Sequence, residues 1–129
     1  MTIELTSLVL TAALSLALTL VYTAIYSKQV GSAGLTSNRE ETPAPTGAAA
    51  RGLRAHRNLI ENLVPFAIVV LTAHVLSISS TVTVWCAIAF PIARFIHAVS
   101  YVAGITGVRT FAWNVGLLVT VVYLVDLFI

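Results

Sequence analysis

Apolar residues form four long runs along the chain, separated by shorter polar segments. The runs cover about residues 5–26, 51–76, 82–103 and 109–128. A helix needs roughly 20 mainly apolar residues to cross the hydrocarbon layer of a membrane. The uncharged stretch 62–91 is too long for one span, and the polar cluster 77–81 divides it between the second and third runs. The pattern predicts an all-α integral membrane protein, with residues 1–129 forming a single domain, a bundle of four transmembrane helices.

The first connection, residues 27–50, differs in composition from the rest of the chain. It is rich in Gly, Ser, Thr, Pro and Ala, and it carries the charged triplet 39–41. Pro43 and Pro45 disfavour a helix there. Loops of this length are usually functional or disordered. We therefore expect a long polar loop between the first two helices, whereas the other connections are short.

Composition and charge support a membrane protein and exclude other classes. The chain is 58% hydrophobic and 9% charged, whereas soluble domains are about 25% charged. A net charge of +2 is too small to suggest nucleic-acid binding. Basic residues gather around the first connection and border the third, at Lys28, Arg39, Arg51, Arg54, Arg57 and Arg109. Because positive loops stay in the cytosol, loops 1 and 3 are expected there and both termini on the opposite side.

The sequence offers little for a metal ion or a disulfide. The single Cys86 lies inside the third apolar run, so neither a disulfide framework nor a Cys-based metal site is expected. The three histidines do not pair at i, i+4 on one helix, as metal ligands on a helix would. We expect no metal ion in this protein.

Two charged residues lie well inside the membrane. Glu61 is fifteen residues from Leu76, about 22 Å, and Arg94 is twelve residues from Val82, about 18 Å. A charge near the centre of a helix costs about 2.5–3.5 kcal/mol, so each needs a partner. Their similar depth predicts that Glu61 and Arg94 pair with each other. The pair could serve a ligand site or only fix the register of the two helices.

Polar residues recur at helical spacing on three of the runs. They are Arg51, Arg54, Asn58, Glu61 and Pro65 on the second, Arg94, His97 and Tyr101 on the third, and Arg109, Trp113 and Gly116 on the fourth. Residues at this spacing share one face of a helix. We expect the three stripes to meet in a pocket in the cytosolic half of the bundle. The alternative for the arginines of the second run is that they anchor the helix at lipid phosphates.

These residues resemble a known family. The motif Arg54-Ala-His-Arg-Asn58-x-x-Glu61-x-x-x-Pro65, followed by Ala93-Arg94-x-x-His97-x-x-x-Tyr101 and Arg109, closely resembles the MAPEG family, the membrane-associated proteins of eicosanoid and glutathione metabolism. The resemblance covers essentially the whole chain, and the short termini and the loop 38–41 look like those of bacterial members. It implies a homotrimer of four-helix bundles in a bacterial inner membrane, with a glutathione site between subunits that opens to the cytosol.

The resemblance also implies roles for individual residues. Positions that match glutathione-binding residues of the family are Arg54, Asn58, Glu61, Arg94 and Tyr101. His56 matches a position that reaches the peptide from the adjacent subunit, and His97 stands where some members have a tyrosine that contacts glutathione. Arg109 matches the arginine that activates the thiol. Arg51, on the same stripe as Arg54, is expected in this site as well.

The chemistry agrees with glutathione as a co-substrate. Guanidinium groups suit its two carboxylates because they offer two parallel donors and keep their charge. A thiol attacks as its thiolate, which a nearby cation such as Arg109 favours. The expected function is a glutathione-dependent transferase or peroxidase acting on lipophilic electrophiles or hydroperoxides that arrive through the lipid bilayer. The alternative is a non-catalytic, lipid- or partner-binding member; a transporter is disfavoured because no repeat or broken-helix pair is present.

Overall fold

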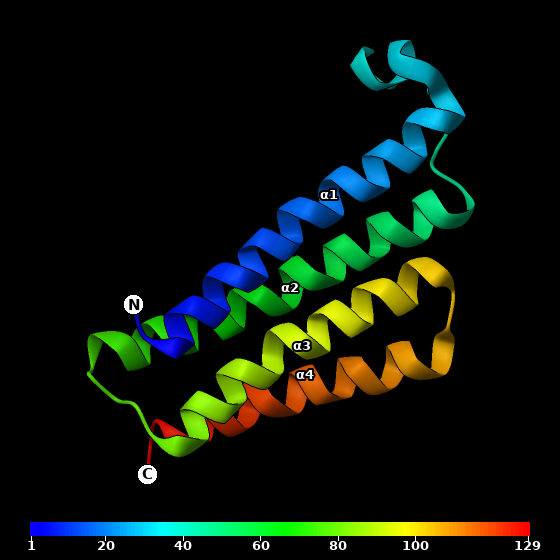
Figure 1. Ribbon diagram of the computed structural model, residues 1–129. Coiled ribbons are helices and arrows are strands. Elements are labelled where there is room, and N and C mark those ends of the chain that lie inside the picture. The colour runs from blue at the N-terminus through cyan, green and yellow to red at the C-terminus, as the bar shows by residue number, and fades with distance from the viewer.

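The computed structural model describes residues 1–129 as four helices without strands. They are α1 (Ile3–Thr36), α2 (Gly47–Val75), α3 (Thr81–Ala103) and α4 (Thr106–Asp126). Each is long and apolar enough to cross a membrane. The helices run up and down beside one another, and both termini lie at the same end of the bundle (Figure 1). The prediction of an all-α, four-span membrane bundle is confirmed.

The first helix is longer than its apolar run. It continues past residue 26 to Thr36, and the connection shrinks from the expected 27–50 to 37–46. Gly31, with φ 69°, interrupts the helical geometry and kinks the last turns. A change from apolar to polar composition marks where the chain leaves the lipid, but a helix satisfies its own backbone hydrogen bonds in either solvent. The change in composition therefore did not locate the end of the helix.

Side chains of α1 hold the following connection against the start of α2. The Tyr26 hydroxyl donates to the carbonyl oxygen of Pro43 at 2.6 Å. The Gln29 amide donates to the carbonyl of Thr46 at 3.1 Å, and its oxygen accepts from the Thr46 N–H at 3.1 Å. These contacts order the polar end of the bundle.

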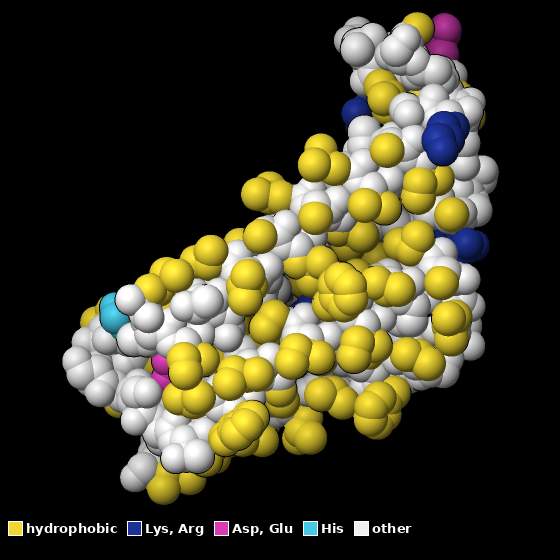
Figure 2. Space-filling view, in the orientation of Figure 1, with side chains coloured by type: hydrophobic (Ala, Val, Ile, Leu, Met, Phe, Trp, Pro, Cys, Tyr) yellow, Lys and Arg dark blue, Asp and Glu magenta, His cyan; other side chains and the backbone are white.

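Small residues form the packed faces of the helices. The buried ones are Ala49, Gly52, Ala55, Ala73, Ala87, Ala93, Ala98, Ala112 and Gly116. Many large side chains such as Leu16, Ile68 and Phe111 instead point outwards, and hydrophobic side chains cover much of the visible surface (Figure 2). Because lipid tails are as apolar as leucine, helices in a membrane associate through close packing, which small residues permit.

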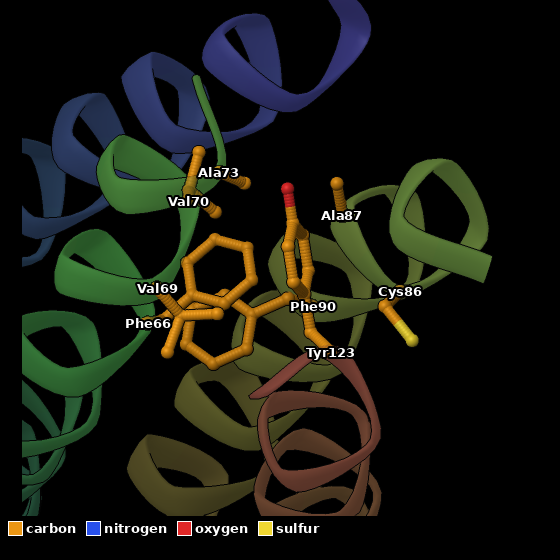
Figure 3. Packing of buried hydrophobic residues seen from close by; sticks show 8 residues of the cluster. All are labelled: Phe66, Val69, Val70, Ala73, Cys86, Ala87, Phe90 and Tyr123. Carbon is orange, nitrogen blue, oxygen red and sulfur yellow. The ribbon is translucent and has the colours of Figure 1, made fainter. Parts of the chain in front are cut away.

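One larger cluster occupies the half of the bundle nearest the termini. Phe66 of α2 and Phe90 of α3 stack with ring centroids 3.7 Å apart, and Tyr123 of α4 meets Phe66 edge-on at 6.3 Å (Figure 3). This cluster joins three helices, whereas α1 contacts α2 and α3 but not α4. The outer faces of α1 and α4 are therefore open to lipid or to another protein surface.

Candidate functional site

Arg94 is completely buried within the bundle. Its Nη1 donates to Asn58 Oδ1 at 3.5 Å, and its Nη2 donates to the carbonyl oxygen of Trp113 at 3.0 Å. Its Nε is buried without a hydrogen-bond partner. The guanidinium carbon lies 5.3 Å from the centroid of the Phe90 ring. A permanent positive charge is thus enclosed by neutral groups alone.

The prediction that Glu61 pairs with Arg94 in the same chain is wrong. The side-chain hydrogen bonds of Arg94 go to Asn58 and Trp113, and Glu61 is exposed. The buried face of α2 includes Leu59, and Glu61, two residues further at about 100° per residue, points to nearly the opposite side. Depth along the helix axis was therefore a poor guide to pairing, because it says nothing about direction around the axis.

The α3 stripe does face the interior of the bundle. His97 is buried, and its ring meets Tyr101 edge-on with centroids 5.4 Å apart. The guanidinium carbon of Arg109, from the first turn of α4, lies 4.7 Å from the centroid of the Tyr101 ring. A row of side chains thus runs from Arg94 through His97, about one turn further along α3, and Tyr101 to the half-buried Arg109. No group of three or more His, Cys, Asp or Glu side chains is arranged to hold a metal ion.

Part of the α2 stripe faces away from its own bundle, contrary to the expectation that all three stripes meet inside. Arg54, Glu61 and Pro65 are exposed, and only the half-buried Asn58 reaches Arg94. A charged side chain on the outside of a membrane helix requires water, lipid headgroups or another protein surface. The outward direction of this stripe is the geometry that a site between subunits would need.

Arg51 and His56 contact other parts of the chain. Arg51 Nε donates to the carbonyl oxygen of Val102 at 2.9 Å. His56 Nε2 shares a hydrogen bond of 2.9 Å with Thr19 Oγ1. Both residues link α2 to neighbouring helices at the polar end of the bundle. Their expected part in ligand binding stays a prediction, as do the ligand roles of the residues in the Arg94–Arg109 row.

Two groups that surround Arg94 have no role in the sequence-based prediction of the site. Phe90 precedes it by four residues, one helical turn, and this spacing predicts the contact between them. Gly116 had been placed on the α4 stripe without a role, but a Cβ at that position would overlap the guanidinium of Arg94. In the sequence, the signal for this close approach is a glycine one helical turn after Trp113. At that position the backbone of α4 can lie directly against the Arg94 side chain.

Replacing Gly116 by Ala is expected to destabilise the protein. The added methyl group would displace an enclosed guanidinium, and overpacking of this kind costs about 1–3 kcal/mol. Thermal unfolding of the detergent-solubilised protein should show a lower midpoint than wild type. Gly107→Ala is the matched control on the same helix, because no atom lies within 4 Å of its Cβ. A Gly116→Ala midpoint equal to that of the control would contradict the close contact.

Two comparisons with known proteins bear on this site. The chain matches the model of the MAPEG family over residues 4–129, which include every residue of the site. No curated protein sequence matches the chain significantly.

Proposed function

This chain belongs to the MAPEG family, and we propose that it is a membrane-bound, glutathione-dependent transferase or peroxidase. The family includes glutathione transferases and peroxidases as well as non-catalytic members. The observation that carries the proposal is the buried Arg94, which has no carboxylate partner in its own chain. An uncompensated buried charge is strongly destabilising. A ligand that brings carboxylates to the row from Arg94 to Arg109 would supply the missing charge.

We propose that glutathione binds between two subunits of a homotrimer. Members of the family are often oligomeric and bind glutathione and lipophilic substrates. The outward direction of Arg54 and Glu61 supports an intersubunit site, because each then finds a partner outside its own bundle. In this arrangement Arg54 binds a glutathione carboxylate through two parallel donors, and Glu61 binds the ammonium group. Asn58 lies between the outward stripe and Arg94.

Arg109 is the residue that we propose activates the thiol. Its guanidinium lies over the Tyr101 ring, and this cation–π contact restrains the group while leaving its N–H donors free for a ligand. Arg109 also lies in the first turn of α4, where the helix dipole favours an anion. Both effects stabilise a thiolate relative to a thiol.

The thiolate can then react in one of two ways. It attacks an electrophilic carbon, forming a C–S bond while the leaving group departs with its electron pair. With a hydroperoxide it attacks the terminal oxygen and breaks the O–O bond. The alkoxide takes a proton to give an alcohol, and the resulting sulfenic acid condenses with a second glutathione to give the disulfide and water. In both reactions Arg109 acts on the thiol. The electrophile or hydroperoxide reaches the thiolate from the lipid.

The direction in the membrane follows from charge. Both termini lie at one end (Figure 1), and most of the visible Lys and Arg side chains lie towards the α1–α2 connection (Figure 2). We propose that this basic end, with the first and third loops, faces the cytosol of a bacterial inner membrane. The glutathione site then opens to the compartment that contains glutathione.

Calorimetric titration of glutathione into the detergent-solubilised protein tests this proposal. The Arg54→Ala variant loses a charged hydrogen bond to a glutathione carboxylate, which is worth about 1.5–3 kcal/mol. It should therefore bind glutathione roughly 10- to 100-fold more weakly than wild type. Arg39→Ala is the control, since it removes the same charge from an exposed loop position. If the wild type fails to bind glutathione at millimolar concentration, the proposal is wrong.

A non-catalytic, lipid-binding role is the second candidate. Two neighbouring grooves lie between α1 and α3, with volumes of about 580 Å³ and 410 Å³. The second is lined by hydrophobic residues alone, and both grooves share Leu14 and Phe95. Such a surface suits an acyl chain, whether as a substrate or as a ligand that does not react. Lipid binding without glutathione binding would favour this second role.

A further inference from the structure

A buried acidic side chain lies at the end of the bundle opposite the arginine-rich site. Glu4 in the first turn of α1 is only 6% exposed. Its Oε1 accepts from the Ser79 hydroxyl at 2.7 Å and from the Thr83 hydroxyl at 3.4 Å. Nearby, Asp126 accepts from the Ser80 hydroxyl at 2.6 Å. The hydrogen-bond donors of both acids are neutral hydroxyls, so neither carboxylate is paired with a cationic side chain.

A cavity of about 260 Å³ adjoins the Glu4 side chain. Its polar lining comprises Thr2, Glu4, His74, Ser77, Ser79 and Tyr123. A single water needs about 10–15 Å³, so the cavity has room for a ligand of several non-hydrogen atoms. Figure 2 shows a histidine and an acidic side chain on the surface at this end, away from the visible basic groups.

Tyr123 supplies an independent sign of a ligand. The side chain is completely buried, and its hydroxyl has no hydrogen-bond partner. The hydroxyl points away from the Phe66–Phe90 stack, between Ala73 and Ala87 and towards α1 (Figure 3). Leaving a buried hydroxyl unpaired costs about 1–3 kcal/mol, which a ligand with hydrogen-bonding groups would recover. The cluster therefore contains both an unbalanced charge and an unused polar group.

We propose that this cavity binds a primary ammonium group. The group carries a positive charge to pair with Glu4, and its three N–H donors match the acceptors of the lining, the Glu4 carboxylate, the Tyr123 oxygen and a His74 ring nitrogen. A quaternary ammonium has no N–H donor and does not fit this set. The cavity lies at the ends of the spans, at the level of lipid headgroups. The ammonium is therefore that of a small soluble amine or of a phosphatidylethanolamine headgroup.

Thermal unfolding in lipid nanodiscs tests this site and separates the two sources. The protein is placed in phosphatidylcholine discs and titrated with ethanolamine, or placed in discs that also contain phosphatidylethanolamine. At least one form of the amine should raise the unfolding midpoint, whereas choline at equal concentration should not. A response to ethanolamine identifies a soluble amine, and a response to phosphatidylethanolamine alone identifies the headgroup.

Two variants connect the response to this cavity. Glu4→Gln should weaken the apparent affinity for the amine at least about tenfold, because a charge-assisted hydrogen bond is lost. Tyr123→Phe, which keeps the packed ring, should weaken it severalfold and remains informative if Glu4→Gln does not fold. Glu41→Gln, in the exposed loop at the other end, is the control and should respond like wild type. Equal stabilisation by choline, an unaltered response in both cavity variants, or no response to either amine would overturn the proposal.

Discussion

Replacing Arg109 by Ala is expected to lower kcat/KM for conjugation of glutathione to a chromogenic electrophile by up to about 30-fold at pH 7. A thiol with an ordinary pKa of about 8.5 is only about 3% thiolate at that pH, so full activation is worth roughly 30-fold. The defect should shrink as the pH rises past 8.5, because free ionisation then replaces the effect of the arginine. The dependence of kcat/KM on pH, for wild type and variant, measures both effects.

Two further variants separate thiol activation from a general loss of charge. Arg109→Lys keeps a cation at the start of α4 and should recover part of the activity at pH 7. Arg39→Ala, in the exposed loop, should match wild type at every pH. A loss in Arg109→Ala that is the same at pH 7 and pH 9 would show that Arg109 positions the substrate without lowering the pKa of the thiol.

Replacing Arg94 by Met is expected to reduce glutathione affinity by more than about 100-fold while keeping the protein folded. Removing one member of a buried charge pair, here Arg94 beside a glutathione carboxylate, costs about 3–5 kcal/mol. A loss of this size corresponds to a decrease in affinity of at least about 100-fold. Without ligand, however, Arg94 is enclosed by neutral groups and has an unpaired Nε. A methionine of similar length removes that unbalanced charge, and replacing buried charges with apolar groups is often neutral or stabilising.

The two readouts for Arg94→Met are calorimetric titration and the midpoint of thermal unfolding without ligand. A ligand role predicts that affinity falls while the midpoint stays equal or rises. A purely structural role predicts that the midpoint falls and that any remaining folded protein binds glutathione normally. Phe95→Met, at the adjacent and exposed position, is the control and should change neither.

Several features of the fold and site follow directly from the order of residues. Run lengths predicted the four helices, because the thickness of the hydrocarbon layer sets a minimum length for a span. The i, i+3, i+7 spacing of Arg94, His97 and Tyr101 predicted that they share a face, and the structure aligns His97 and Tyr101 with Arg109. Local periodicity was sufficient here because these residues belong to one rigid helix.

Other features depended on contacts between helices. The sequence predicted a Glu61–Arg94 pair from equal depth, but the direction of α2 sends Glu61 outwards and leaves Asn58 beside Arg94. The unpaired Tyr123 hydroxyl and the buried Glu4 could not be read from spacing, since they come from opposite ends of the chain. Each of these facts requires knowing which helix lies next to which.

The sequence by itself determined which segments are long and apolar enough to cross a membrane, how far along its helix each polar residue lies, and the family to which the chain belongs. Only the tertiary structure decided which polar stripe faces the interior and which faces outwards. The reason lies in the solvent: both sides of a membrane helix meet apolar surroundings, so hydrophobicity does not mark the inner face. Close approach at small residues such as Ala55 and Gly116 sets the rotation of each helix, and with it the partners of Arg94 and the exposure of Glu61.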